Sequence, residues 1–442
     1  MTEFCDKTKQ LFDAMRDENL EESRKLIDEL DGEELDVVDY KRRTPLCYAA
    51  ANEGFDEILS MLIDRGADIN HQNINGYTPL MFAVRMNRLS IVKMLQYYGH
   101  ADVNIRGKFG ETALIFACSH KTSIEMVRLL LDEGAMIDAY TTRVCEQPTA
   151  LFGAIRQGNL DLVRLLLERG ANPNQSHHKT HLQPIHAAAE MGNPKILELL
   201  LIYKADVNAR YTTDITPLGV AAIHDRVENA EILIRYGADI NYRGRAGFTP
   251  LIDACFSASH GVANILLYHT DINIMATDDE GRTALCHLCG ASLVTKVTPP
   301  GESEDYHKKA RQQLLKRMLD NGADPNHKPL QEYSPLLETL YRKEPELATI
   351  LLDAGADFDE EHPIYGYTPL KFACQYRLTD VAKRLIEMGA DIQHKYDSGE
   401  TIWMYAAYDD ELIKMLEDRG LSKMDDYDKD TANDFTCGDA DY

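Results

Sequence analysis

Apolar residues recur along the chain in short blocks, which polar turns separate at a nearly constant distance. One representative block is Gly76–Ala83. It begins a segment that ends with Tyr98–Asn104. Thr78 can accept a hydrogen bond from a free backbone N–H at the start of a helix, and Pro79 fits the first helical turn, where no donor is needed. Gly99 can end a second helix by adopting the left-handed conformation. The pattern therefore predicts a helix, a turn, a second helix and a projecting loop.

The same pattern recurs eleven times. The position equivalent to Thr78 falls at Thr44, Thr78, Thr112, Thr149, Gln183, Thr216, Thr249, Thr283, Ser334, Thr368 and Thr401. Successive positions are 33, 34 or 37 residues apart, except for one interval of 51. A period of about 33 residues with Thr-Pro-Leu, paired alanines and Gly-Ala-Asp-x-Asn resembles the ankyrin repeat family. The resemblance covers roughly residues 6–435, and it implies an all-α solenoid of stacked helix-turn-helix units with β-hairpin-like finger loops.

The repeat register predicts three segments. Residues 1–38 form an N-terminal helical capping unit, with helices at Asp6–Arg16 and Leu20–Leu30, because a stack needs a polar outer end. Residues 39–424 form the repeat array. The interval of 51 residues places an insertion at about Ser292–His307, between the two helices of one repeat, with the second helix beginning near Glu304. Residues 425–442 form an acidic tail that contains a truncated repeat start.

The charge of the chain bears on its partners. It carries 72 acidic and 47 basic residues, for a formal net charge of −25. This balance argues against nucleic acid or anionic lipid as the main partner, because such binding depends on neutralising phosphates with Lys and Arg. No apolar run reaches about 18 residues and the N-terminus lacks a signal-peptide core, so we expect no membrane insertion and a cytoplasmic protein, with the nucleus also possible.

Two groups of residues could hold a metal. Cys286 and Cys289 have the CxxC spacing, but they stand in a first helix with no second pair nearby, so we favour buried, reduced thiols. His177, His178 and His181 could bind zinc if their rings converged. We favour a polar finger tip here. No catalytic motif occurs, so we expect a non-enzymatic protein without a cofactor or a small-molecule ligand.

The resemblance implies that partners bind the concave side, at the residue before each Thr position and at the exposed end of the first helix. Aromatic residues, Met and Arg at these places are suited to anchor an interface, because they bury large areas at modest entropic cost. The candidates form one group near residues 77–86, a richer group between residues 333 and 376, and a single ring at residue 248. They are Tyr77, Arg85, Met86, Phe248, Tyr333, Tyr341, Tyr367 and Tyr376. The alternative is that some rings pack sideways on the neighbouring finger.

The leading hypothesis is a non-enzymatic scaffold that binds one or more proteins on its concave face. One alternative is a structural component of a large permanent assembly, cytoskeletal or ciliary, which would bury apolar residues on the outer helices. Another is an adaptor or effector that presents a client to an enzyme, which would normally require an appended recruitment module.

Overall fold

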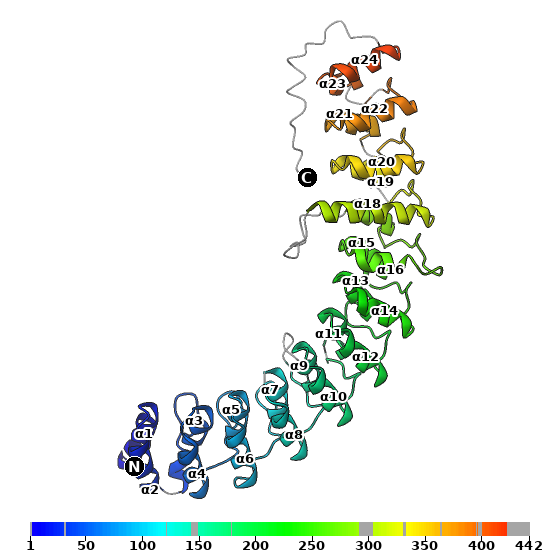
Figure 1. The fold of residues 1–442 in the computed structure, drawn as a ribbon. Coiled ribbons are helices and arrows are strands. Elements are labelled where there is room, and N and C mark those ends of the chain that lie inside the picture. Colours follow the sequence, from blue (N-terminus) through cyan, green and yellow to red (C-terminus); the bar gives the residue numbers. More distant parts are fainter. Residues whose placement is uncertain are drawn as a thin grey trace. The chain divides into compact units, whose positions relative to one another are not determined.

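The protein folds into consecutive pairs of helices joined by short turns, as the computed structural model in Figure 1 shows. The structure describes residues 2–421, apart from residues 31, 121, 143–148, 178, 291–303, 330–332, 363–364, 395 and 397–399. The chain divides into two compact halves, residues 1–212 and residues 213–442. Within each half the first helices of successive repeats pack on one another, and the second helices pack on one another along the other side.

Each first helix begins directly after the predicted Thr position. In the N-terminal half these helices are α3 (Pro45–Ala51), α5 (Pro79–Arg85), α7 (Ala113–Ser119), α9 (Ala150–Arg156) and α11 (Pro184–Met191). In the C-terminal half they are α13 (Pro217–Ile223), α15 (Pro250–Phe256), α17 (Ala284–Gly290), α19 (Pro335–Tyr341), α21 (Pro369–Gln375) and α23 (Ile402–Ala406). The predicted cap is confirmed: Oγ1 of Thr78 accepts the N–H of Met81 at 3.3 Å, and Pro79 occupies the first turn. Thr401 differs, since its side chain caps no helix N–H.

The second helices are mostly nine residues long. In the N-terminal half they are α4 (Asp56–Asp64), α6 (Leu89–Tyr97), α8 (Ile124–Asp132), α10 (Leu160–Glu168) and α12 (Pro194–Ile202). In the C-terminal half they are α14 (Val227–Arg235), α16 (His260–Leu266), α18 (Glu304–Asp320), α20 (Pro345–Asp353), α22 (Thr379–Met388) and α24 (Asp410–Asp418). Helix α18 begins at Glu304, as predicted, and is the longest of this set at 17 residues.

The predicted role of Gly99 is wrong. The left-handed residue after α6 is His100, with φ of 51°, and Gly99 is not among the residues with positive φ. Gly99 is needed for a close approach instead, because a Cβ there would lie 2.9 Å from the carbonyl oxygen of Leu95 and 3.0 Å from the Ile69 side chain. In other repeats a glycine takes the left-handed position that His100 takes here: Gly134 and Gly170 have φ of 83° and 93°.

Neighbouring repeats are joined by two recurring sets of polar contacts. In the fingers, Oδ1 of Asn104 accepts the N–H of Met136 at 2.7 Å, and its Nδ2 donates to the carbonyl of Gly134 at 3.0 Å. At the turns between helices, side chains satisfy the last carbonyls of the preceding first helix. Gln157, for example, donates to the carbonyl oxygens of Cys118 and His120 at 2.6 and 2.8 Å. The Asn of Gly-Ala-Asp-x-Asn is thus a connection between repeats.

The chain begins with α1 (Thr2–Arg16), α2 (Leu20–Glu29) and the short 3₁₀ helix η1 (Gly32–Asp36); a second, η2 (Arg245–Gly247), lies in a finger. Within the described ranges the fingers contribute only isolated bridges to β structure, at Tyr140–Thr149 and Thr277–Thr283. The part of the insertion before Glu304 and the acidic tail, residues 425–442, lie outside the described residues.

Candidate partner-binding surface

The fourth residue after each Thr position organises the side of the stack that carries the predicted contacts. This position is aromatic in several repeats: Tyr48, Phe82, Phe116, Phe372 and Tyr405. The rings of Phe82, Phe116 and Phe372 each contact a ring that precedes the Thr position of their own repeat or of a neighbouring one. We call this side, formed by the first helices and the fingers, the first-helix face.

Two of the candidates near residues 77–86, Tyr77 and Arg85, lie around Phe116, and we call these three residues the Phe116 cluster. Tyr77 packs edge-on against Phe116, with ring centroids 5.1 Å apart, and its hydroxyl donates to Oε1 of Glu111 at 3.2 Å. Arg85 is exposed and its guanidinium lies 5.8 Å from the centre of the Phe116 ring. Met86 is 49% exposed, whereas Tyr77 is only 9% exposed. Arg85 and Met86 therefore offer more surface to a partner than Tyr77 does.

The second group converges on one buried ring, Phe372, and we call it the Phe372 cluster. The ring centroids of Tyr333, Tyr341, Tyr367 and Tyr376 lie 5.8, 6.5, 5.7 and 6.0 Å from that of Phe372. Tyr333 also stacks on Tyr341 at 5.2 Å, and Tyr341 is 41% exposed. Burial raises the pKa of Tyr333 from 10 to about 12. The structure brings these four predicted tyrosines together.

Beside the Phe372 cluster, a lysine is enclosed by aromatic rings. The ammonium of Lys371 lies 3.4, 4.4 and 5.0 Å from the ring centres of Tyr367, Tyr396 and Tyr405. It pairs with Oε2 of Glu400 at 2.8 Å, and the Lys371 side chain has no exposed surface. Burial lowers the pKa of Lys371, and the Glu400 carboxylate opposes that shift. We call these rings and Glu400 the Lys371 cage.

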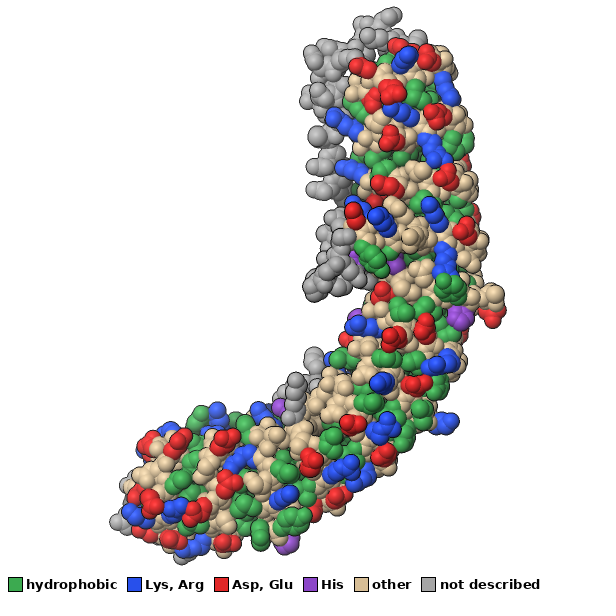
Figure 2. Space-filling view, viewed as in Figure 1, with side chains coloured by type: hydrophobic (Ala, Val, Ile, Leu, Met, Phe, Trp, Pro, Cys, Tyr) green, Lys and Arg blue, Asp and Glu red, His purple; other side chains and the backbone are tan. Residues whose placement is uncertain are grey.

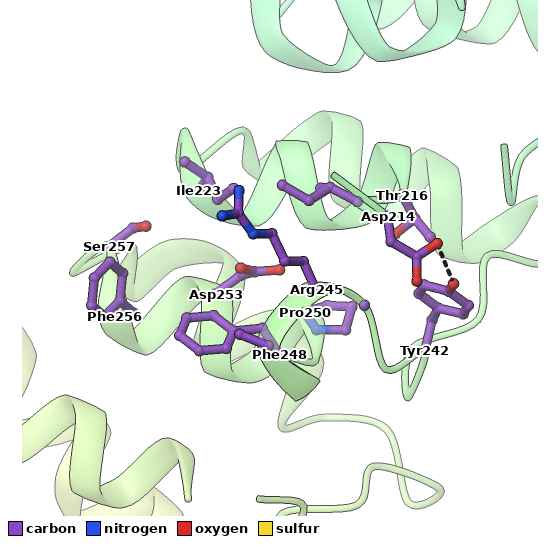
Figure 3. A pocket seen from close by; sticks show the side chains of 13 residues that line it. Asp214, Thr216, Ile223, Tyr242, Arg245, Phe248, Pro250, Asp253, Phe256 and Ser257 are labelled. Carbon is purple, nitrogen blue, oxygen red and sulfur yellow. Dashed lines mark hydrogen bonds between the residues drawn. The ribbon is translucent and has the colours of Figure 1, made fainter. Parts of the chain in front are cut away.

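A pocket of about 400 Å³ opens between α13, α15 and the finger that joins α14 to α15. Figure 3 shows the side chains that line it. At one end the hydroxyl of Tyr242 donates to Oδ1 of Asp214 at 2.9 Å. We call this space the Asp253 pocket, after the carboxyl group in its lining.

The Asp253 carboxyl shares this space mainly with apolar groups. In Figure 3, Phe248 and Phe256 lie on one side of it and Ile223 on the other, while Arg245 extends across the pocket. Within the part of the chain that the structure describes, the Asp253 side chain makes no hydrogen bond or ion pair. Burial raises its pKa to about 7, because an ionised carboxylate is poorly solvated among apolar groups.

Phe248, the remaining candidate, is half-buried in the wall of this pocket. Its ring centroid lies 5.6 Å from that of Phe256 and 5.2 Å from that of His287. Behind these rings, Nε2 of His287 lies 2.8 Å from Oδ2 of Asp278, and both residues are buried. Burial lowers the pKa of His287, so the His287–Asp278 pair is best described as a structural hydrogen bond.

The possible metal ligands have structural roles where the structure describes them. Nδ1 of His177 accepts the N–H groups of Lys179 and Thr180, both at 3.3 Å. Cys286 and Cys289 are buried, and burial raises the pKa of both thiols. His178 lies outside the described residues, and the residues inside them include no cluster of metal-ligating side chains.

A family model described as ankyrin repeats (3 copies) matches residues 11–107, 96–177, 185–278 and 306–396, which together make up most of the chain. The chain belongs to the ankyrin repeat family. Ankyrin repeats generally mediate protein–protein interaction, and proteins of this family are typically non-enzymatic. No helix in the described ranges has the length and apolar character required to cross a bilayer.

Curated relatives resemble this ankyrin chain over short stretches. A putative ankyrin repeat-containing protein of Treponema pallidum is 38% identical over 95 residues, which are 21% of this chain and 31% of that protein. Human transient receptor potential cation channel subfamily A member 1 is 36% identical over 103 residues, 23% of this chain and 9% of the channel. Mouse Rabankyrin-5 is 26% identical over 167 residues, 38% of this chain and 14% of the relative. Each match spans less than a third of the relative.

Sequence reasoning did not predict Phe372, Phe116 or Asp253 as parts of a site. The signal that could have found them is the register, since all three stand four residues after a Thr position. At this register position Asp253 replaces the aromatic ring that several other repeats carry. The aromatic cage around Lys371 left a weaker signal, because its members come from three different finger and helix positions.

Proposed function

We propose that this protein is a non-enzymatic scaffold that binds partner proteins through its first-helix face. The Phe372 cluster carries this proposal. Four tyrosine rings held around one buried phenylalanine form a rigid surface, and little side-chain entropy is lost when a partner covers it. Tyrosine is also among the residues that contribute most to binding at protein interfaces.

The net charge of −25 favours protein partners over nucleic acid. Acidic and basic side chains are interspersed with hydrophobic ones over the face that Figure 2 shows. Six cysteines are buried free thiols, which suits a reducing compartment: Cys47, Cys118, Cys255, Cys286, Cys289 and Cys374. We therefore place the scaffold in the cytoplasm or the nucleus. The division of the chain is also part of this proposal: a cap at residues 1–38, a repeat array at residues 39–424 and a tail at residues 425–442.

The test is capture of partners from the native cell extract by the full chain and by Tyr341→Ala/Tyr376→Ala. We expect the double substitution to reduce capture of a wild-type partner by about tenfold or more, since truncating a central aromatic anchor commonly costs that much affinity. Tyr236→Ala is the matched control, because Tyr236 is 39% exposed, close to the 41% of Tyr341, and stands at the end of α14.

The thermal midpoint of each variant establishes that it is folded. Unchanged capture by a folded Tyr341→Ala/Tyr376→Ala chain would remove the Phe372 cluster from the proposal. Equal loss in Tyr236→Ala would place the contact on the second helices instead.

A second candidate function is favoured by exposed apolar residues on the second-helix side of the N-terminal half. Tyr97 at the end of α6 is 60% exposed, and Ile202 at the end of α12 is 56% exposed. A structural component of a permanent assembly would bury such residues. In that case Tyr97→Ser/Ile202→Ser would shift the protein from a large complex to its own size in gel filtration of native extract, and an unchanged elution profile would exclude this role for these two residues.

A further inference from the structure

The Asp253 pocket contains a carboxyl group that has no hydrogen-bond or ion-pair partner among the residues that the structure describes. Asp253 stands where Phe116 and Phe372 stand in their repeats, so a ring at this register position is replaced by an ionisable group. The residues that line the pocket with it include the apolar Ile223 and Phe248 as well as polar ones, among them Arg245. Burying an unpaired carboxylate costs free energy, and perturbed carboxyl groups of this kind gather at functional sites. A ligand that supplied the missing positive charge would remove the cost.

The same half of the chain contains a filled version of this arrangement. In the Lys371 cage an ammonium lies over aromatic rings and pairs with a carboxylate, Glu400, at 2.8 Å. Cations are attracted to the faces of aromatic rings as well as to carboxylates. The Asp253 pocket has two of the same components, the rings of Phe248 and Phe256 and a carboxyl group, but no cation from the described ranges is paired with that carboxyl.

Size and charge both fit a basic side chain from outside. The pocket volume of about 400 Å³ leaves room for the apolar stem and charged end of a long side chain. The net charge of −25 attracts basic segments of other proteins over a distance. Such side chains bury their methylene groups against apolar surface while the charged end seeks a partner.

We propose that the Asp253 pocket binds a lysine or arginine side chain presented by a partner protein. The stem packs against Ile223 and the rings of Phe248 and Phe256, and the cation pairs with the Asp253 carboxylate. This inference rests on the proposed scaffold function and adds the chemistry that the partner must carry at this point of the first-helix face.

Arg245 is the competing cation, because its exposed side chain also borders the pocket. Its guanidinium makes no ion pair within the described part of the chain, so it does not neutralise Asp253 in the structure. A variant without this charge, Arg245→Gln, separates the two possibilities.

The experiment offers pools of short synthetic peptides to the immobilised full-length protein at pH 8. Each pool has one fixed central residue (lysine, arginine, norleucine or glutamate) and random flanking residues that exclude lysine and arginine. We expect the wild-type chain to retain the lysine or arginine pool about tenfold better than the norleucine pool, as a charge-assisted pair in a partly buried site provides. Asp253→Asn should abolish that preference.

The matched control is Asp320→Asn, which makes the same change in charge at the exposed end of α18 and should leave the preference intact. Equal retention of the norleucine pool, or retention of no pool, would overturn the proposal. So would a basic preference seen only in Arg245→Gln, because Arg245 would then fill the site itself. The Tyr341→Ala/Tyr376→Ala chain should keep the peptide preference, so failure of the Phe372 cluster and failure of this pocket give different results.

Discussion

Nζ of Lys371 lies 2.8 Å from Oε2 of Glu400, and the two residues are 29 positions apart in the sequence. Lys371 is fully buried, so the pair is shielded from the water that weakens most surface ion pairs. It links the first helix of one repeat to the residue before the Thr position of the next. Glu400 lies on a finger, where the repeat pattern predicts contacts with partners. Its role in the structure is instead to pair with the buried Lys371.

Glu400→Gln should destabilise the C-terminal half by about 2–4 kcal/mol, because it leaves a buried ammonium without its carboxylate. Lys371→Met should cost less than about 1 kcal/mol, since a methionine can fill the aromatic cage without a charge. Hydrogen exchange of α21 and α23 measures both effects locally. Glu411→Gln is the control: it breaks the exposed Lys383–Glu411 pair and should have little effect. A larger effect of Lys371→Met than of Glu400→Gln would contradict this account.

Asp253→Asn should stabilise the protein at pH 8 and not at pH 4. The pKa of the Asp253 carboxyl is raised from 3.8 to about 7 by burial, so the folded state favours the protonated form. The stability associated with this group is therefore complete below pH 4 and is lost as the pH rises toward 7. The amide has no charge to bury, so we expect a gain of about 1–3 kcal/mol at pH 8, measured by urea denaturation.

The difference between wild type and variant isolates this group from its titrating neighbours. Asp214, which accepts from Tyr242, and Arg245 border the pocket, and His287 contacts Phe256 from α17. These groups are present in both chains, so their contributions largely cancel. The same gain at pH 4 and pH 8 would show that the substitution acts by packing and not by removing a charge.

Arg88→Ala should destabilise the N-terminal half by about 2–3 kcal/mol. Arg88 donates to the carbonyl oxygen of Ala49 and to Oδ2 of Asp56, both at 2.7 Å, and it is 9% exposed. Its loss leaves the carbonyl oxygen of Ala49, near the end of α3, without this donor. Arg85→Ala, three residues away on exposed surface, should change stability by less than about 1 kcal/mol, because it loses only a weak contact with Phe116. Thermal unfolding compares the two, and equal shifts would refute the structural role given to Arg88.

The repeat pattern allowed the helices to be predicted closely because their start signals are local. Thr78 caps a helix whose first N–H groups lie within three residues of it, so the cap depends on adjacent sequence alone. Gly99 was misassigned for the opposite reason. Its lack of a side chain serves an approach to Ile69, in the preceding repeat, and local sequence does not record that distance.

For the predicted binding residues too, the sequence predicted some properties and the neighbouring repeats determined others. The positions of Tyr333, Tyr341, Tyr367 and Tyr376 followed from the register, and the register also explains why they converge on Phe372. Their exposure did not follow from it. Tyr77 is 9% exposed and Tyr341 is 41% exposed, although both were predicted as contacts, because exposure depends on which rings the neighbouring repeats supply.

By itself, the sequence determined the repeat, its helix pairs, its family and the side of the stack that carries aromatic residues. These features depend on residues within one period of about 33 positions. Only the tertiary structure decided that Lys371 is paired and that Asp253 has no partner among the described residues. Protonation and pairing of a buried group depend on desolvation and on charges within a few ångströms. Stacking brings together residues that are a whole repeat apart, and so it determines both the protonation and the pairing of such a group.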